Sequence, residues 1–149
     1  MSNYISADRV FLDNPATTVE EAFAFLSDKA LELGITDDRD AVEEAFKARE
    51  ALGSTGMHGG FAIPHAKTDA VKEAALIAVK FTNDIDWKSM DGQPIKAAIA
   101  LFAPASDPTT YLGLLSKVAV LLANEAFCAK VLDSLDIAEI ADAILAGLD

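Results

Sequence analysis

Two stretches decide the fold: Ala74-Ala-Leu-Ile-Ala-Val-Lys-Phe-Thr82 and Ile95-Lys-Ala-Ala-Ile-Ala-Leu-Phe-Ala103. Both are nearly continuous apolar runs bounded by turn residues, a pattern typical of central strands that are covered on both faces. The segment between them ends in Asp91-Gly-Gln-Pro94, where glycine permits a positive φ and proline fixes the exit. The sequence therefore predicts two buried strands at the centre of a sheet.

Helical patterns lie on both sides of these strands. Thr18-Val-Glu-Glu21 is a capping box that opens an apolar repeat at helical spacing, and Gly34 ends that repeat. The same reasoning predicts four further helices: one starting at 38–40 and ending at Leu52, one from Pro108 to Asn124, one over 125–132 and one over 136–148. Helices, strands and helices in that order predict an α/β layered domain.

Length and composition indicate one globular domain over residues 1–149, with 52% hydrophobic residues excluding a disordered chain. The formal net charge is −12. Such a surface repels phosphate backbones and anionic lipids, so nucleic acid and membranes are not the expected partners. A basic protein surface would be attracted instead.

Neither a metal site nor a disulfide is expected. Cys128 is the single cysteine and lies in an apolar helical run, which favours a buried thiol over a nucleophile. The two histidines are not at ligand spacing, so no metal and no cofactor are predicted. No signal sequence and no apolar run long enough to cross a bilayer is visible, so we expect a cytoplasmic protein without direct membrane insertion.

One region departs from the pattern of a packed domain, namely 49–65. It holds a helix end, a loop with four glycines in eight positions (53–60), and a histidine directly after a proline. At its ordinary pKa of ~6.5, roughly three quarters of the His65 imidazole is unprotonated at pH 7 and nucleophilic. A lone histidine at a strand end is more often structural, but Pro64 pins the backbone beside this one.

The neighbours of His65 suggest phosphoryl chemistry. Backbone N–H groups at Gly56, Gly59 and Gly60 can approach an anion closely. Arg49 brings a planar guanidinium suited to phosphoryl oxygens. Because the loop lacks the Lys-Ser/Thr ending of a nucleotide-binding P-loop, the expected phosphoryl acceptor is the protein itself.

These residues carry a resemblance to a known family. Arg49-Glu-Ala-Leu-Gly-Ser-Thr-Gly56 and Phe61-Ala-Ile-Pro-His-Ala66 resemble the active-site signature of the mannitol/fructose-type enzyme IIA domains of the bacterial phosphoenolpyruvate:sugar phosphotransferase system. The likeness extends through 67–71 and 91–94 and covers the chain from about Thr18 to Leu148. It implies a central mixed β-sheet flanked by helices on both faces.

The resemblance also implies a mechanism and a set of site residues. His65 would accept a phosphoryl group from the phosphohistidine of the carrier protein HPr and pass it to a IIB component for uptake of a fructose- or mannitol-class sugar. Such a protein is a phosphotransferase that needs no cofactor. Arg49 would contact the phosphoryl group, and the loop around it would include Thr55 and Gly56 together with Gly59 and Gly60.

Two positions depart from the family pattern. Many members have a second histidine where this chain has Tyr111, and a tyrosine donates a hydrogen bond but carries no positive charge. His58 stands where the family loop usually has a small residue. It is interpreted first as an exposed loop residue and second as a partial replacement for the missing histidine.

Three functions stay open at this point. The first is a phosphocarrier in sugar uptake. The second is a regulatory module similar to the nitrogen-related IIA proteins, whose phosphorylation state controls partner binding. The third is a scaffold that has lost phosphorylation. The sequence identifies neither the sugar nor the oligomeric state.

Overall fold

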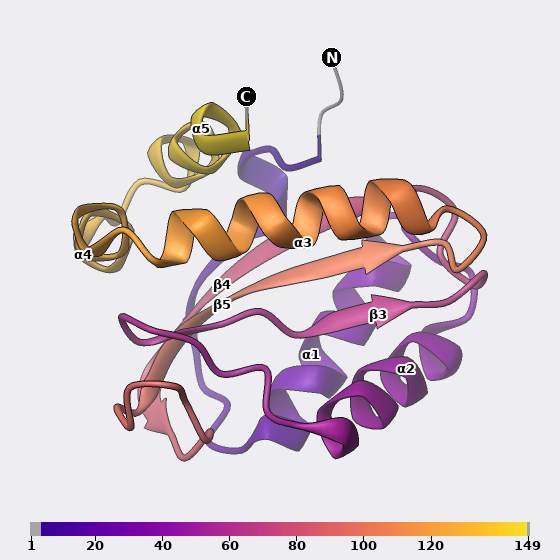
Figure 1. Ribbon diagram of the computed structural model, residues 1–149, viewed down its shortest axis with the longest axis horizontal. Coiled ribbons are helices and arrows are strands. Elements are labelled where there is room, and N and C mark those ends of the chain that lie inside the picture. Colours follow the sequence, from indigo (N-terminus) through magenta and orange to yellow (C-terminus); the bar gives the residue numbers. More distant parts are fainter. Residues whose placement is uncertain (1–3, 149) are drawn as a thin grey trace.

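A computed structural model of the chain describes residues 4–148. Its centre is one five-stranded sheet with the order β1-β4-β5-β2, in which β3 also pairs with β5 (Figure 1). The strands are β1 (Val10–Asn14), β2 (Phe61–Ala62), β3 (His65–Lys67), β4 (Ala75–Ile85) and β5 (Ile95–Ala103). The two apolar stretches form β4 and β5, which confirms their predicted central position.

The sheet is mixed, as the resemblance implied. β4 and β5 pair antiparallel, with Ile77 opposite Ala100, while β1 runs parallel to β4, and β2 and β3 run parallel to β5. Ile63 and Pro64 separate the two-residue strand β2 from the three-residue strand β3.

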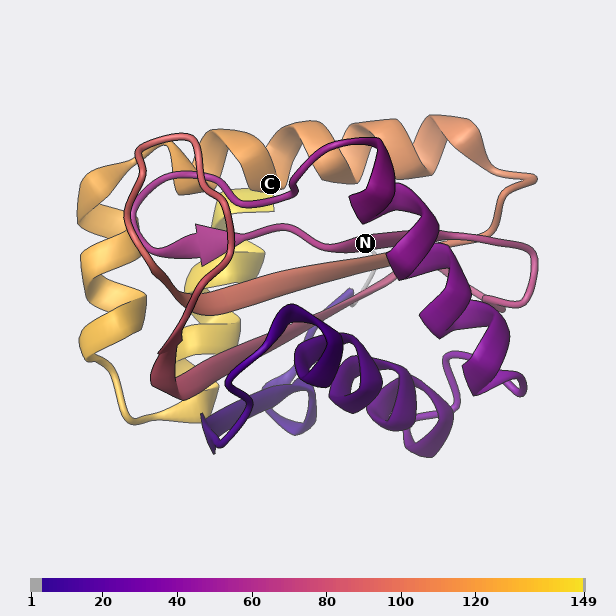
Figure 2. The ribbon, with the colours of Figure 1, turned by 90° about the horizontal axis from the view of Figure 1, so that it is seen from below.

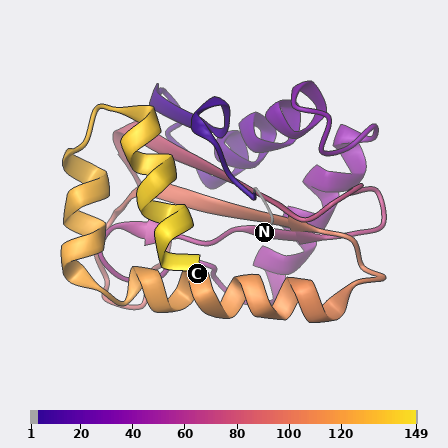
Figure 3. The same ribbon diagram turned by 90° about the horizontal axis from the view of Figure 1, so that it is seen from above.

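Helices cover both faces of the sheet, which confirms the predicted α/β class. One face packs against α1 (Val19–Glu32) and α2 (Arg39–Leu52), seen nearest the viewer in Figure 2. The other packs against α3 (Pro108–Leu122), α4 (Glu125–Asp133) and α5 (Ile137–Leu148), seen nearest in Figure 3. A single 3-10 turn, Ala7–Arg9, precedes β1.

Alternation along β5 divides the buried side chains into two cores. Ala98, Ala100 and Phe102 belong to the core with α1 and α2. Ile99 and Leu101 belong to the core with α3, α4 and α5. Because successive side chains point to opposite faces, a strand that is apolar at both positions must be covered on both faces.

Side chains cap the N-termini of the helices, as the capping box at Thr18 predicted for α1. The hydroxyl of Thr18 accepts from the N–H of Glu21 at 3.1 Å, and Asp38 and Asn124 cap α2 and α4 in the same way. Asp107 caps α3, whose first residue is the predicted proline. These side chains accept the N–H groups that the first helical turn leaves unpaired.

Strand β1 was not predicted, because the first regular apolar pattern in the sequence begins at Thr18. The strand has only five residues, and its burial does not alternate cleanly. It pairs with β4, so its partner lies more than sixty residues further along the chain, as in Val10 opposite Ala78. Local pattern gives no sign of such a long-range parallel pairing.

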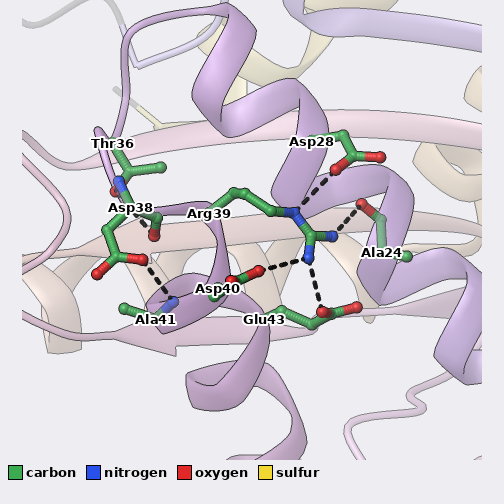
Figure 4. A network of polar contacts seen from close by, with 8 residues as sticks. All are labelled: Ala24, Asp28, Thr36, Asp38, Arg39, Asp40, Ala41 and Glu43. Atoms are coloured by element: carbon green, nitrogen blue, oxygen red, sulfur yellow. Dashed lines mark hydrogen bonds and ion pairs between the residues drawn. The ribbon is translucent and has the colours of Figure 1, made fainter.

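Arg39 joins the two helices on one face of the sheet (Figure 4). Its guanidinium donates to Asp28 of α1 at 2.9 Å and to Asp40 and Glu43 of its own helix at 2.9 and 2.8 Å. It also donates to the carbonyl of Ala24 at 3.3 Å. This fork of donors fixes the start of α2 against α1.

Among residues 4–148, no single helix has both the length and the apolar composition to cross a membrane. The pair that reaches these limits together, α3 and α4, is bent by 85°.

Candidate active site

His65 is the first residue of β3 and pairs with Leu101 of β5. Its neighbour Ala66 packs into the core beneath α1 and α2, so strand alternation directs His65 and Lys67 to the opposite face, toward α3. The His65 side chain is 6% exposed. The strand thus holds a buried imidazole at the sheet edge, between α2 and α3.

The His65 ring has a defined tautomer. Nδ1 lies 2.8 Å from the carbonyl oxygen of Ile63. A carbonyl only accepts, so Nδ1 carries the proton and Nε2 keeps its lone pair. Burial lowers the His65 pKa from its ordinary value, the Arg49 charge lowers it further, and the Ile63 carbonyl and the Glu50 charge act against them. The ring is therefore neutral and nucleophilic at Nε2 at pH 7.

Tyr111, in the first turn of α3, packs against His65. The two ring centroids are 5.8 Å apart and the planes are tilted by 51°. The ammonium of Lys67 lies 5.1 Å from the centroid of the same tyrosine ring, a cation–π distance. Burial raises the pKa of the Tyr111 hydroxyl, so the hydroxyl is protonated and can donate at neutral pH.

Arg49 lies in the last turn of α2 and uses one guanidinium N–H to hold the chain beyond the helix. Nη1 donates to the carbonyl oxygen of Gly53 at 2.8 Å. A guanidinium has five N–H donors, so four of its donors make no hydrogen bond within residues 4–148. The charge of Arg49 acts to lower the pKa values of both His65 and Tyr111.

Thr55 is held by Glu50. The Thr55 hydroxyl donates to Glu50 Oε1 at 2.6 Å, and its backbone N–H donates to Glu50 Oε2 at 3.1 Å. Glu50 Oε2 also accepts from the indole Nε1 of Trp87 at 3.1 Å. The carbonyl of Thr55 in turn accepts from the N–H of Ile63 at 2.9 Å. Thr55 therefore connects the end of α2 with the segment that carries His65.

The glycine loop rests on the connection between β4 and β5. Ser54 donates its hydroxyl to the carbonyl of Lys88, and the N–H of Met90 donates to the carbonyl of Met57 at 3.2 Å. A Cβ on Gly56 would lie 2.2 Å from the Lys88 carbonyl oxygen, so only glycine fits there. Both segments are visible beside the sheet in Figure 2.

Protein acceptors already use most of the loop amides. Thr55 N donates to Glu50, Gly56 N to Ser54 Oγ at 3.1 Å, and Gly59 N to Asp91 Oδ2 at 3.1 Å. The predicted cradle of loop amides therefore needs a local rearrangement before those three groups reach an anion. Within the described part of the chain, Arg49 and Tyr111 have donors that make no hydrogen bond and need no such change.

Gly59 and Gly60 shape the turn into β2, where both have positive φ values, +67° and +84°. The Gly60 carbonyl accepts from Lys96 N at 2.7 Å, five residues before the His65 partner Leu101 on β5. That spacing corresponds to roughly 16 Å along a strand. The structure thus places these two glycines away from His65, whereas it brings Thr55 close to it.

His58 is exposed and also lies away from His65. It lines a cavity of about 550 Å³ with Gly59, Asp91, Cys128 and Leu122. Leu122 ends α3, about 16 Å along the helix from Tyr111. The structure therefore does not bring His58 to the His65–Tyr111 pair, which favours its interpretation as an exposed loop residue.

Two residues at this site, Glu50 and Lys67, were not among the site residues predicted from the sequence. Lys67 follows His65 by two positions on a strand, and that period alone places both on one face. Glu50 neighbours Arg49 at a helix end, but its contact with Trp87 joins positions far apart in the chain and leaves no local signal. Cys128 is buried as predicted, and within residues 4–148 no three His, Cys, Asp or Glu side chains gather to hold a metal.

Comparison with known proteins identifies the class to which this fold and site belong. The family described as "Phosphoenolpyruvate-dependent sugar phosphotransferase system, EIIA 2" matches residues 3–147. The chain belongs to this family. As a IIA component of a sugar phosphotransferase system, it is a phosphoryl-transfer protein.

Relatives include both transport and regulatory proteins. The chain is 34% identical over 134 residues to the fructose-specific EIIA component of Haloferax volcanii, covering 90% of this chain and 87% of the relative. It is 34% identical over 117 residues to a nitrogen regulatory protein of Bradyrhizobium diazoefficiens, covering 78% of this chain and 76% of the relative.

Solved structures show the same fold. The nitrogen regulatory protein IIA-Ntr of Neisseria meningitidis superposes with a TM-score of 0.87 at 24% identity, covering 95% of this chain and 96% of that one. The Escherichia coli IIA mannitol enzyme, in its complex with phosphorylated IIB mannitol enzyme, superposes with a TM-score of 0.81 at 16% identity, covering 95% and 97%.

Proposed function

We propose that this protein carries a phosphoryl group on His65 Nε2, accepting it from the phosphohistidine of HPr and passing it to a IIB component for sugar uptake. The observation that carries the proposal is the 2.8 Å contact between His65 Nδ1 and the Ile63 carbonyl, which leaves Nε2 as the nucleophile. The cytoplasmic location expected from the sequence belongs to the same proposal.

The transfer is a simple exchange of bonds. The Nε2 lone pair attacks phosphorus while the nitrogen–phosphorus bond of the donor histidine breaks, and that bonding pair returns to the donor ring. His65 then bears a phosphoryl group on a cationic ring, whose Nδ1–H donates more strongly to Ile63. In the second half-reaction the acceptor's nucleophile bonds to phosphorus and the Nε2–phosphorus bond breaks.

Arg49 and Tyr111 supply the stabilising groups. Within residues 4–148, Arg49 has N–H donors that make no hydrogen bond, and charge-assisted contacts with phosphoryl oxygens are among the strongest available. The Tyr111 hydroxyl donates a neutral hydrogen bond, because its ring packs against that of His65 with centroids 5.8 Å apart. Lys67, over the tyrosine ring, adds a positive charge where the family pattern has a second histidine.

The test is the intact mass of the protein after incubation with phosphoenolpyruvate, enzyme I and HPr. We expect one acid-labile phosphoryl group on the native chain and none on His65→Ala. An unlabelled native chain, with a known IIA domain labelled in parallel, would refute the proposal and favour the scaffold alternative.

A regulatory role is the second candidate. A nitrogen regulatory protein shares the fold, and another has the same sequence identity to this chain, 34%, as the fructose-specific relative. The fructose-specific relative favours transport of a fructose-class sugar. The two functions differ in the second half-reaction. Rapid loss of label from phosphorylated protein to a fructose-type IIB component supports transport, and retention of the label in its presence supports regulation.

A further inference from the structure

Glu50 is a half-buried carboxylate beside the proposed site to which the transfer mechanism assigns no role. It accepts three hydrogen bonds on two oxygens, two from Thr55 and one from the indole of Trp87. Trp87 is 3% exposed and packs edge-on against Phe23 of α1, with ring centroids 5.7 Å apart. Glu50 therefore links Trp87, which is fixed in the core, to Thr55, which lies in the glycine loop.

A chain of hydrogen bonds connects Glu50 to the ring of His65. Glu50 holds Thr55, the Thr55 carbonyl accepts from Ile63 N at 2.9 Å, and the Ile63 carbonyl faces His65 Nδ1 at 2.8 Å. The last contact fixes both the tautomer and the orientation of the ring. A displacement of Thr55 is thus passed to the position of Nε2.

We propose that Glu50 is a positioning residue for phosphoryl transfer, acting through Thr55 and Ile63 to hold His65 with Nε2 presented to the donor. The proposal rests on the proposed function of His65. Glu50 acts on geometry and does not touch the phosphoryl group. A misplacement of about 1 Å at a reacting atom costs as much as 100-fold in rate.

Two substitutions separate geometry from charge. Glu50→Ala removes all three contacts. Glu50→Gln keeps them, because its carbonyl oxygen accepts from Thr55 N and Trp87 Nε1 while its NH2 group donates to a rotated Thr55 hydroxyl. Glu44, exposed on the same helix, provides the matched control Glu44→Ala.

The first measurement is the steady-state rate of phosphoryl transfer from phosphorylated HPr. We expect Glu50→Ala to lower kcat by about 10- to 100-fold with KM for HPr unchanged, and Glu50→Gln to stay within about fivefold of the native kcat. Glu44→Ala should match the native protein. A native kcat for Glu50→Ala, a change confined to KM, or equal losses in the Gln and Ala variants would each overturn the proposal.

The second measurement needs no phosphoryl transfer, so it distinguishes failure of this proposal from failure of the proposed function. A long-range proton–nitrogen NMR spectrum of His65 reports its tautomer. The native protein and Glu50→Gln should show Nδ1–H alone, and Glu50→Ala a mixture of tautomers. Emission of Trp87, the single tryptophan, should shift to longer wavelength in Glu50→Ala only. Native spectra for Glu50→Ala would overturn the proposal even in a protein that transfers nothing.

Thr55→Val keeps the test open if Glu50→Ala does not fold. It removes the 2.6 Å contact with Glu50 Oε1 while preserving side-chain shape. We expect kcat to fall about three- to tenfold, with KM unchanged, for the loss of one hydrogen bond. A native kcat for a folded Thr55→Val would overturn the proposal.

Discussion

Gly56→Ala gives a direct test of how the glycine loop is supported. The new Cβ would lie 2.2 Å from the Lys88 carbonyl oxygen and 3.0 Å from Ser89 Cα. Both neighbours are backbone atoms, so no side chain can rotate away to make room. Separating them to an ordinary contact requires one of the two segments to move by about 1 Å.

The cost follows from what that movement breaks. Thr55 and Met57, on either side of Gly56, pair with Ile63 and Phe61 through hydrogen bonds of 2.9 and 2.8 Å. Overpacking costs about 1–3 kcal/mol, and each weakened hydrogen bond adds about 1 kcal/mol. We therefore expect a loss of about 3–5 kcal/mol, which for a chain of this length lowers Tm by roughly 6–20 °C.

Thermal and urea unfolding measure this loss, and Gly113→Ala is the matched control. Gly113 lies exposed in α3, and nothing stands within 4 Å of the position of its Cβ. Alanine there should stabilise the helix by about 0.5–1 kcal/mol. If Gly56→Ala unfolds at the native midpoint, the proposed close packing of the loop on Lys88 is refuted.

Three further predictions concern the site and its support. In an NMR titration, His65 should show a pKa below its ordinary ~6.5. The buried neutral ring then favours the folded state above that pH, and this contribution to stability is lost as pH falls through the folded pKa. A midpoint at or above ~6.5 contradicts this. Tyr111→Phe should lower the rate of phosphoryl acceptance by about tenfold through loss of one hydrogen bond to a charged group, and an unchanged rate would exclude that role. Lys80→Met should lower the free energy of unfolding by about 1–3 kcal/mol, measured in urea against the exposed control Lys47→Met. The Lys80 ammonium donates at 2.7 Å to the carbonyl of Leu132, in the last turn of α4, and at 2.6 Å to that of Ser134, just beyond the helix. Equal stabilities for the two variants would show that these bonds contribute nothing.

Much of the fold could be predicted from local sequence, because its signals are local. The caps at Thr18, Asp38 and Asn124 act within three residues, and the apolar runs of β4 and β5 report burial directly. β1 could not be found in this way, since its pairing with β4 is decided by the packing of the whole sheet.

The same distinction between local and long-range signals applies to the candidate site. Pro64 beside His65 and the glycine loop indicated the site because backbone restriction and freedom are visible in sequence. The contacts that define the geometry join distant segments, as do the Trp87 indole with Glu50 and Tyr111 with His65. Tyr111 was reached through the family resemblance, and Glu50 only through the structure.

Nitrogen-resolved NMR of the phosphorylated protein shows which atom carries the phosphoryl group. We expect a phosphorus coupling at Nε2 of His65, with Nδ1 still protonated and bonded to the Ile63 carbonyl. A phosphoryl group on Nδ1, or on any residue other than His65, would contradict it.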